Sequence, residues 1–247
     1  MASSLEDLRV VKSVVPLTGR RGTIAKRMTH SILTAPQGTQ FIDVDMTASL
    51  ALRERLNDGF KAANGFGLSL TAIIVKAVAR ALQDNPLLNS VIEDNQIKLI
   101  ANVNIGVAVA LDDGLVVPVI HNAHEKSIEE IAVALNELSR KARARRLSAP
   151  EMSGGTFSIT NLGMYGTGHF TPLLNTPESA ILGVGAIEEK AVIRDGQVVA
   201  RPMMGLGLTM DHRAVDGVPA AICFSRIREL LQTGLGASAQ DNQEARQ

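Results

Sequence analysis

The chain is poor in cysteine and in aromatic residues, and neither sign of charge is in excess. Its 247 residues include one cysteine, Cys223, one tyrosine and no tryptophan. A single cysteine cannot form an intrachain disulfide, so we expect a reducing, cytoplasmic location. Because Cys223 lies in an apolar helical stretch, we expect a buried thiol rather than a nucleophile. Lys and Arg total 25, as do Asp and Glu, which argues against a nucleic-acid-binding or polybasic membrane-binding protein.

Long hydrophobic runs and the common nucleotide and metal motifs are also missing. No stretch approaches the roughly 20 apolar residues that a membrane-spanning helix needs. Neither G-x-G-x-x-G at the start of a helix nor G-x-x-x-x-G-K before Ser or Thr occurs, so dinucleotide and nucleoside triphosphate sites are not predicted. His121 and His124 have no cysteine or carboxylate partners of the usual kind, so no metal site is predicted either.

The alternation of apolar patterns predicts one α/β domain between two irregular ends. Residues 1–17 look like a linker or an extended arm, residues 18–233 form the folded domain, and residues 234–247 form a flexible tail. Helical spacing covers 21–33, 49–60, 71–83, 127–146 and 219–231, and strand patterns cover 40–46, 90–93, 97–100, 103–111, 115–120, 156–160, 180–184, 191–194 and 198–209. Asp113-Gly114 and Asp195-Gly196 are typical of tight hairpin turns. This order predicts a two-layer α/β sandwich with a mixed sheet.

The most informative pattern is His212-x-x-x-Asp216-Gly217, between a glycine-spaced apolar run and a predicted helix. The histidine therefore belongs to a strand-to-helix turn, where a base can meet a substrate. Histidine is the side chain whose unperturbed pKa, about 6.5, suits proton transfer near neutral pH, and a carboxylate four residues later can fix the geometry of the ring. The competing interpretation is that Asp216 only caps the helix and His212 is an ordinary turn residue. The pattern alone does not choose between the two.

Two other segments each allow a structural and a functional interpretation. Residues 163–168 are rich in glycine, and we expect a tight loop that approaches a ligand or a neighbouring chain. The 127–146 helix begins with a capping box at Ser127 and Glu130. It ends with five basic residues: Arg140, Lys141, Arg143, Arg145 and Arg146. A solvated helix end is the simpler interpretation of these residues, and a phosphate contact is the alternative.

Three ordered motifs carry a more specific signal than the histidine turn. They are Gly154–Gly163 (GGTFSITNLG), Phe170–Gly185 (FTPLLNTPESAILGVG) and Asp211–Gly217 (DHRAVDG). In this order and spacing they resemble the catalytic domain of dihydrolipoyl acyltransferases, which form the cores of 2-oxo acid dehydrogenase complexes. The resemblance extends to Arg21–Met28 and Asp113–Ile120 and covers roughly residues 16–233. It implies a fold like that of chloramphenicol acetyltransferase and assigns the folded domain to acyl transfer.

The resemblance implies that an acyl group passes between a lipoyl-lysine thiol and the thiol of coenzyme A. His212 would take the proton from the attacking thiol and return it to the departing sulfur, while the Thr160 hydroxyl would stabilise the oxyanion. Asp216 would hold the local turn. The pattern alone makes Thr160 a strand-end hydroxyl, but it stands 52 positions before His212, as in the family. The family places these two groups on different subunits, which implies a homotrimer with its site at an interface.

Similarity to family members also suggests a channel for coenzyme A. Its predicted lining residues, besides Thr160, are Arg53, Ser69, Asn161, Met164, Gly185 and Ala186. The fork of an arginine suits a phosphate, and small residues let the pantetheine arm approach. Arg53 equally fits a surface position on its helix, and a one-residue gap between Arg53 and Ser69 would change that part of the comparison.

The chain differs from a complete acyltransferase, because it contains neither a lipoyl domain nor a peripheral subunit-binding domain. We therefore expect the lipoyl-lysine arm on a removed segment or another polypeptide. The implied partners are that lipoyl domain, the dehydrogenase (decarboxylase) and dihydrolipoyl dehydrogenase components, and further trimers in a cubic or icosahedral core. Asn161–Gly166 and Phe170–Pro172 look more like acetyl-transferring members, from pyruvate or acetoin complexes. Branched-chain transfer and a noncatalytic scaffold are the alternatives.

Overall fold

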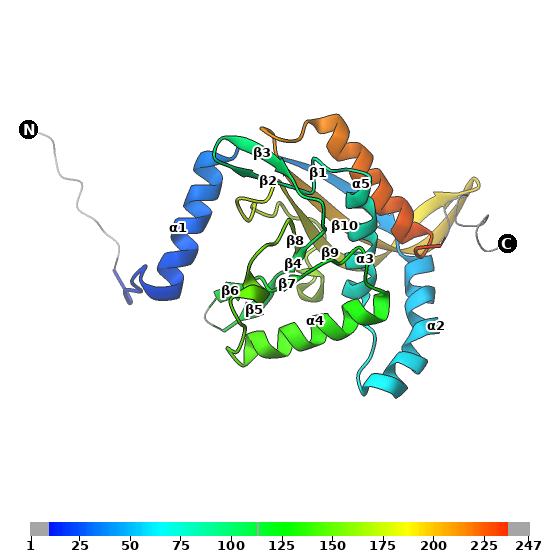
Figure 1. Cartoon of the computed structure of the whole chain (residues 1–247). Helices are drawn as coiled ribbons and strands as arrows, with labels where there is room; N and C mark the ends of the chain where they lie inside the picture. Colours follow the sequence, from blue (N-terminus) through cyan, green and yellow to red (C-terminus); the bar gives the residue numbers. More distant parts are fainter. Residues whose placement is uncertain (1–9, 113, 237–247) are drawn as a thin grey trace, which may run out of the picture.

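A six-stranded mixed sheet forms the centre of the molecule (Figure 1). The computed structural model describes residues 10–112 and 114–236. In spatial order the strands are β1 (Gln37–Asp45), β10 (Gln197–Asp211), β9 (Ala180–Arg194), β8 (Phe157–Asn161), β4 (Ile105–Val107) and β7 (Val119–Ile120). β8 runs parallel to β9 and β4, and the other neighbours are antiparallel. The predicted α/β fold with a mixed sheet is therefore confirmed.

Two small hairpins and five α-helices surround this sheet. The hairpins are β2 (Ser90–Glu93) with β3 (Gln96–Leu99), and β5 (Val109–Leu111) with β6 (Gly114–Val116). The helices are α1 (Gly19–Thr34), α2 (Thr47–Asn64), α3 (Leu70–Gln83), α4 (Ile128–Arg143) and α5 (Gly217–Gln232), and single 3-10 turns occur at η1 (Pro150–Met152) and η2 (Gly163–Tyr165). All five predicted helices are present, and the capping box at Ser127 and Glu130 has both of its hydrogen bonds.

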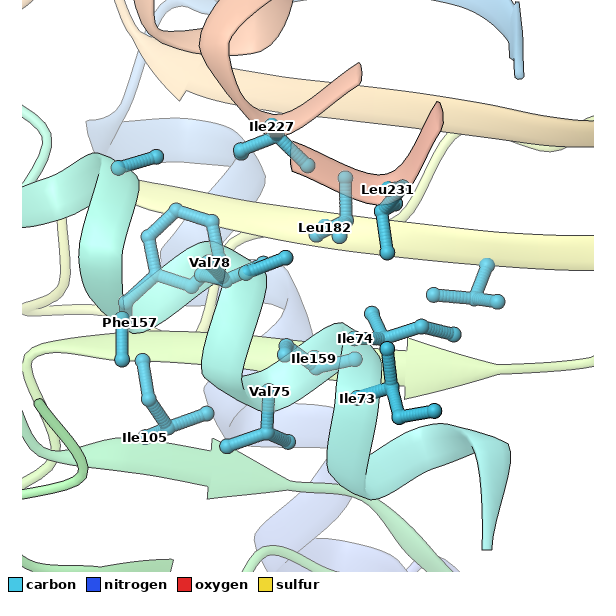
Figure 2. Close-up of a cluster of buried hydrophobic side chains, with 14 of the residues drawn as sticks. Ile73, Ile74, Val75, Val78, Ile105, Phe157, Ile159, Leu182, Ile227 and Leu231 are labelled. Atoms are coloured by element: carbon cyan, nitrogen blue, oxygen red, sulfur yellow. The ribbon is translucent and has the colours of Figure 1, made fainter. Parts of the chain in front are cut away.

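Helix α3 is the central element of the hydrophobic core. It packs between α4 and α5 and covers the sheet, so most of its residues are buried. Figure 2 shows Ile159 of β8 near Ile73 and Ile74 in the first turns of α3, and Phe157 near Val78 further along. Burial of each such side chain contributes about 1.5–3 kcal/mol. The core therefore fixes the carboxyl end of β8 at the same edge of the fold as the start of α3.

The strand boundaries differ from the predicted ones in two regions. The predicted strands at 103–111 and 115–120 are each divided in two, since β4 and β7 join the main sheet while β5 and β6 form a separate hairpin. The segments predicted at 180–184 and 191–194 belong to one strand, β9, whose middle residues Glu188, Glu189 and Lys190 interrupt the apolar pattern. Asp195 and Gly196 connect β9 to β10 with φ of 51° and 77°, as a primed turn requires. Asp113, in the other predicted turn, lies outside the described residues.

The two ends of the described chain differ in how they contact the domain. Residues 10–17 contain no helix or strand and are exposed. After α5 the chain turns back, since Leu235 N–H donates to Leu230 O (2.7 Å) and Arg80 Nη1 donates to Leu235 O (3.1 Å). Residues 1–9 and 237–247, which include most of the predicted arm and tail, lie outside the described part. Within 10–112 and 114–236, no helix is long and apolar enough to cross a membrane.

Candidate active site

His212 lies at the end of β10 with its imidazole open to solvent. Its backbone N–H donates to Pro36 O (2.8 Å), which holds the turn against the start of β1. The side chain is 56% exposed, and its Nδ1 lies 3.5 Å from Asp216 Oδ1. Because Nδ1 faces this carboxylate, Nε2 is the ring nitrogen left to meet a substrate.

Asp216 occupies the N-cap position of α5, as the structural interpretation predicts. Its backbone is extended there, but its side chain makes no cap hydrogen bond to the helix. The carboxylate instead lies beside His212. Capping therefore explains the position of Asp216 and leaves its carboxylate available to orient the imidazole.

A neighbouring ion pair, which the sequence analysis did not identify, fixes the turn that carries His212. The carboxylate of Asp211 is buried and accepts from Arg213 Nε (3.0 Å) and Nη2 (2.6 Å). This bidentate bond raises the pKa of the Arg213 guanidinium. Asp211 N–H also donates to Ser179 O (2.8 Å). The only available signal was the pair of opposite charges flanking the histidine, and such a pair is equally typical of a solvated turn.

Thr160 lies on the other face of the sheet from the α3 core. Phe157 and Ile159 point toward α3 (Figure 2), so Ser158 and Thr160, which alternate with them, point the opposite way. Thr160 pairs with Gly183, and Gly183 pairs with Gly207, five residues before His212. At about 3.4 Å per residue, His212 lies roughly 17 Å further along the sheet. Thr160 and His212 of one chain are therefore too far apart to act on the same thioester.

Four residues predicted to bind coenzyme A cluster beyond the end of β8. Asn161 Oδ1 accepts from Gly163 N–H (2.9 Å), and Ala186 N–H donates to Thr167 O (2.7 Å). Gly163 lies so close to Gly185 that a Cβ atom there would be 2.5 Å from the Gly185 carbonyl oxygen. Met164, on η2, is 84% exposed.

Arg53 and Ser69 lie together at the start of α3. Arg53 Nε donates to Leu68 O (2.8 Å), and Ser69 caps the helix by accepting from Ala72 N–H (3.3 Å). Figure 2 shows Ile73 and Ile74, in the first turns of α3, beside Ile159 of β8. Ser69, which caps α3, and Arg53, which bonds Leu68, therefore lie at the same edge of the fold as the carboxyl end of β8. The exposed position of Arg53 fits both a surface role and a phosphate contact.

The glycine-rich loop packs on this chain's own sheet. The Gly168 carbonyl lies where a side chain on Gly185 or Gly205 would stand. These glycines let the loop pack on β9 and β10, and the approach of the loop to a ligand or a neighbouring chain stays a prediction. His169, in this loop, lies 3.4 Å from Asp43 Oδ1 through Nε2 and packs edge-on against Phe41.

His121, His124 and Lys141, which stands in the basic end of α4, have local partners. His121 Nε2 contacts Pro150 O (3.1 Å), and His124 Nδ1 accepts from Val103 N–H (3.3 Å). At the end of α4, Lys141 bonds Glu137 and Glu151, both at 2.7 Å. Local contacts of this kind are typical of residues on a protein surface.

The sequence matches a family of known function. Residues 11–236 match the family described as 2-oxoacid dehydrogenases acyltransferase (catalytic domain). The match covers most of the chain, and the protein therefore belongs to this family.

Three curated relatives differ in the acyl group that their names give. A succinyltransferase component of the 2-oxoglutarate dehydrogenase complex of Bartonella vinsonii subsp. berkhoffii is 44% identical over 88% of this chain and 53% of that protein. In Bacillus subtilis, the acetyltransferase component of the pyruvate dehydrogenase complex is 42% identical over 87% and 49% of the two chains. The lipoamide acyltransferase component of its branched-chain alpha-keto acid dehydrogenase complex is 38% identical over 89% and 52%. The chain thus spans about half the length of these relatives.

Solved structures support the same fold. The cubic core of the pyruvate dehydrogenase multienzyme complex is 37% identical with a TM-score of 0.85, over 89% of this chain and 91% of that one. The Azotobacter vinelandii dihydrolipoamide acetyltransferase is 36% identical with the same TM-score and the same coverage. In that enzyme a serine, a histidine and an asparagine were investigated for their catalytic role, and the histidine follows the serine by 52 positions and precedes the asparagine by four. Thr160, His212 and Asp216 have this spacing.

Proposed function

We propose that this chain transfers an acyl group between a dihydrolipoyl arm and coenzyme A. The observation that carries the proposal is the solvent-open His212 imidazole beside the Asp216 carboxylate, in a chain of the acyltransferase family. In the proposed direction, His212 Nε2 removes the proton from the thiol of coenzyme A, and the sulfur attacks the carbonyl carbon of the acyl-dihydrolipoyl thioester. The tetrahedral intermediate expels the dihydrolipoyl sulfur, which takes the proton back from the imidazolium.

Thr160 would donate its hydroxyl to the oxyanion of that intermediate. Such a donor stabilises the transition state by about 2.7–4 kcal/mol when it lies about 3 Å from the oxygen. Within one chain the sheet separates Thr160 from His212 by roughly 17 Å. The site therefore needs Thr160 from one subunit and His212 from another, an arrangement that a head-to-tail ring such as a trimer supplies.

Coenzyme A would lie at the edge where Arg53 and Ser69 meet Asn161, Met164 and the backbone of Gly185 and Ala186. The likeness to a cubic core supports assembly of the trimers into a larger particle. In such a complex the partners would be a lipoyl domain, the dehydrogenase component and dihydrolipoyl dehydrogenase.

We propose acetyl as the acyl group, because the chain segment around Thr160 supplies no cation and Arg53, at the same edge, is assigned to coenzyme A. No Lys or Arg occurs from Leu147 to Glu189, the segment that includes β8 and the loops around it. A succinyl group carries a carboxylate, which would lose hydration there without gaining a partner. On the His212 side, the guanidinium of the adjacent residue Arg213 is already paired with Asp211.

Initial rates with acetyl-, isobutyryl- and succinyl-coenzyme A against free dihydrolipoamide test the proposal. We expect kcat/KM to be highest for acetyl-coenzyme A. A higher kcat/KM for succinyl- or isobutyryl-coenzyme A would overturn the assignment of acetyl as the acyl group. It would leave the proposed acyl-transfer reaction unchanged. No transfer from any of the three by correctly assembled protein would contradict the reaction itself and favour a noncatalytic scaffold.

A further inference from the structure

Glu178 is a buried carboxyl group that the proposed reaction does not use. It follows Pro177 in the loop between η2 and β9 and is 4% exposed. Asn175 Nδ2 donates to its Oε1 (2.9 Å), and Ser158 also bonds the carboxyl group. Its other oxygen, Oε2, has almost no contact with solvent and no hydrogen-bond partner among the residues that the structure describes. Ionisation would leave a charged oxygen here without a donor, so this position favours the neutral carboxyl group.

The backbone next to Glu178 holds the turn that carries His212. One step beyond the last paired residues of β9 and β10, Asp211 N–H donates to Ser179 O (2.8 Å). Ser179 directly follows Glu178, and Asp211 directly precedes His212. A movement of Glu178 that displaces the Ser179 carbonyl group therefore also displaces the main chain at His212.

The side chain of Glu178 ties the same loop to β8, the strand that carries Thr160. Ser158 lies two residues before Thr160 and points to the same face of the sheet. Asn175 Nδ2 also donates to Ser158 Oγ (3.3 Å). A Cβ atom on Gly155 would come within 2.8 Å of Glu178 Oε1, so the missing side chain leaves room for the carboxyl group. These contacts of the neutral carboxyl group fix the loop on the sheet, and losing them would release it.

A cavity of about 530 Å³ gives the ionised side chain of Glu178 a second position. The charged and titratable residues around the loop are Arg27 of α1 and Glu93 of β2 on the cavity wall, His121 beside Gly154, and the Asp211–Arg213 ion pair on the side of the His212 turn. Because Glu93 already pairs with Lys98 (3.1 Å), the wall presents Arg27 to a carboxylate. An ionised Glu178 would therefore turn from Ser158 toward this cavity, where water and Arg27 can stabilise its charge.

We propose that Glu178 is a positioning residue for His212. Its neutral carboxyl group holds the Ser179 carbonyl where Asp211 N–H donates to it. Ionisation turns the side chain away from Ser158, loosens this hydrogen bond and displaces the imidazole from the acyl-transfer site. The role rests on the proposed function, because it acts through His212. Burial raises the pKa of Glu178 to about 7, so the neutral fraction should fall about tenfold from pH 6 to pH 8.

The pH dependence of kcat in two variants tests this role. Glu178→Gln keeps an acceptor for Asn175 and does not ionise. Glu93→Gln is the matched control, because it removes a carboxyl group from the wall of the same cavity. The ratio of kcat in Glu178→Gln to kcat in the unaltered protein should rise about tenfold from pH 6 to pH 8, while their KM values for coenzyme A stay equal. The same kcat ratio for Glu93→Gln should stay constant.

Hydrogen exchange of the Asp211 amide tests the structural link without an activity measurement. Relative to its intrinsic rate, this amide should exchange about tenfold faster at pH 8 than at pH 6 in the unaltered protein and in Glu93→Gln. In Glu178→Gln the relative rate should be the same at both pH values, because the amide side chain does not titrate.

The proposal is overturned if exchange of the Asp211 amide does not distinguish Glu178→Gln from the unaltered protein. It is also overturned if the exchange differs and the kcat ratio does not change with pH. An unaltered protein that transfers no acyl group contradicts the proposed function instead, and the exchange result still decides whether Glu178 controls the turn. If Glu178→Gln does not fold, the unaltered protein and Glu93→Gln decide, since exchange that does not quicken from pH 6 to pH 8 overturns the proposal.

Discussion

Replacing the Glu178 carboxyl group by an amide should remove a pH dependence from the stability of the fold. Burial raises the pKa of Glu178 from 4.5 to about 7, while hydrogen bonds from Ser158 and Asn175 oppose the rise. The folded protein therefore holds this proton more tightly than the unfolded chain does. The stability from this group is fully present below pH 4.5 and is lost as the pH rises through about 7.

The size of the effect follows from the shift in pKa. One unit corresponds to about 1.4 kcal/mol, so this group should make the free energy of unfolding about 3 kcal/mol lower at pH 8 than at pH 4. Glu178→Gln keeps nearly the same shape and does not titrate. Relative to the unaltered protein, it should gain about 3 kcal/mol of stability between these two pH values.

Urea unfolding at a series of pH values measures this gain. Protein concentration is held constant because oligomers dissociate. Asp45 and Glu151, whose pKa values are lowered, give the opposite slope in both proteins and cancel in the difference. Parallel pH curves for Glu178→Gln and the unaltered protein would refute the reasoning about burial.

Three further predictions concern packing, reactivity and the oxyanion donor. Gly185→Ala should lower the free energy of unfolding by about 1–3 kcal/mol, because its Cβ would collide with the Gly168 carbonyl. Gly59→Ala in α2 has open space and should raise it by up to about 1 kcal/mol, so equal urea midpoints would contradict the collision. Burial raises the pKa of Cys223 to about 12, so a disulfide reagent at pH 8 should modify it only after unfolding. Thr160→Ser should retain acyl transfer and Thr160→Val should lose roughly 10²–10³-fold in kcat, whereas equal rates would remove the oxyanion role.

Local spacing was enough to predict several parts of this protein. The capping box at Ser127 and Glu130 and the strand-to-helix turn at His212 depend on residues three to five positions apart. Exposed structure was harder to predict. Glu188, Glu189 and Lys190 interrupt the apolar pattern of β9 where it leaves the buried sheet, so its two ends were predicted as separate strands.

Contacts between distant segments could not be predicted from one sequence. Glu178 looks like a solvated turn residue after Pro177, because only the fold reveals the Asn175 and Ser158 contacts and the cavity beside it. The separation of Thr160 from His212 likewise depends on strand register. It needed the pairing of β8 with β9 and of β9 with β10.

Mixing two inactive variants tests most directly whether the acyl-transfer site is shared between chains. Under the proposed function, His212→Ala lacks the base and Thr160→Val lacks the oxyanion donor, so homogeneous assemblies of either should transfer little of the acyl group to dihydrolipoamide. In random mixed trimers about a quarter of the interfaces join an intact His212 to an intact Thr160, so about a quarter of the unaltered activity should return. Activity in demonstrably mixed trimers that stays at the level of the separate variants would contradict the shared site.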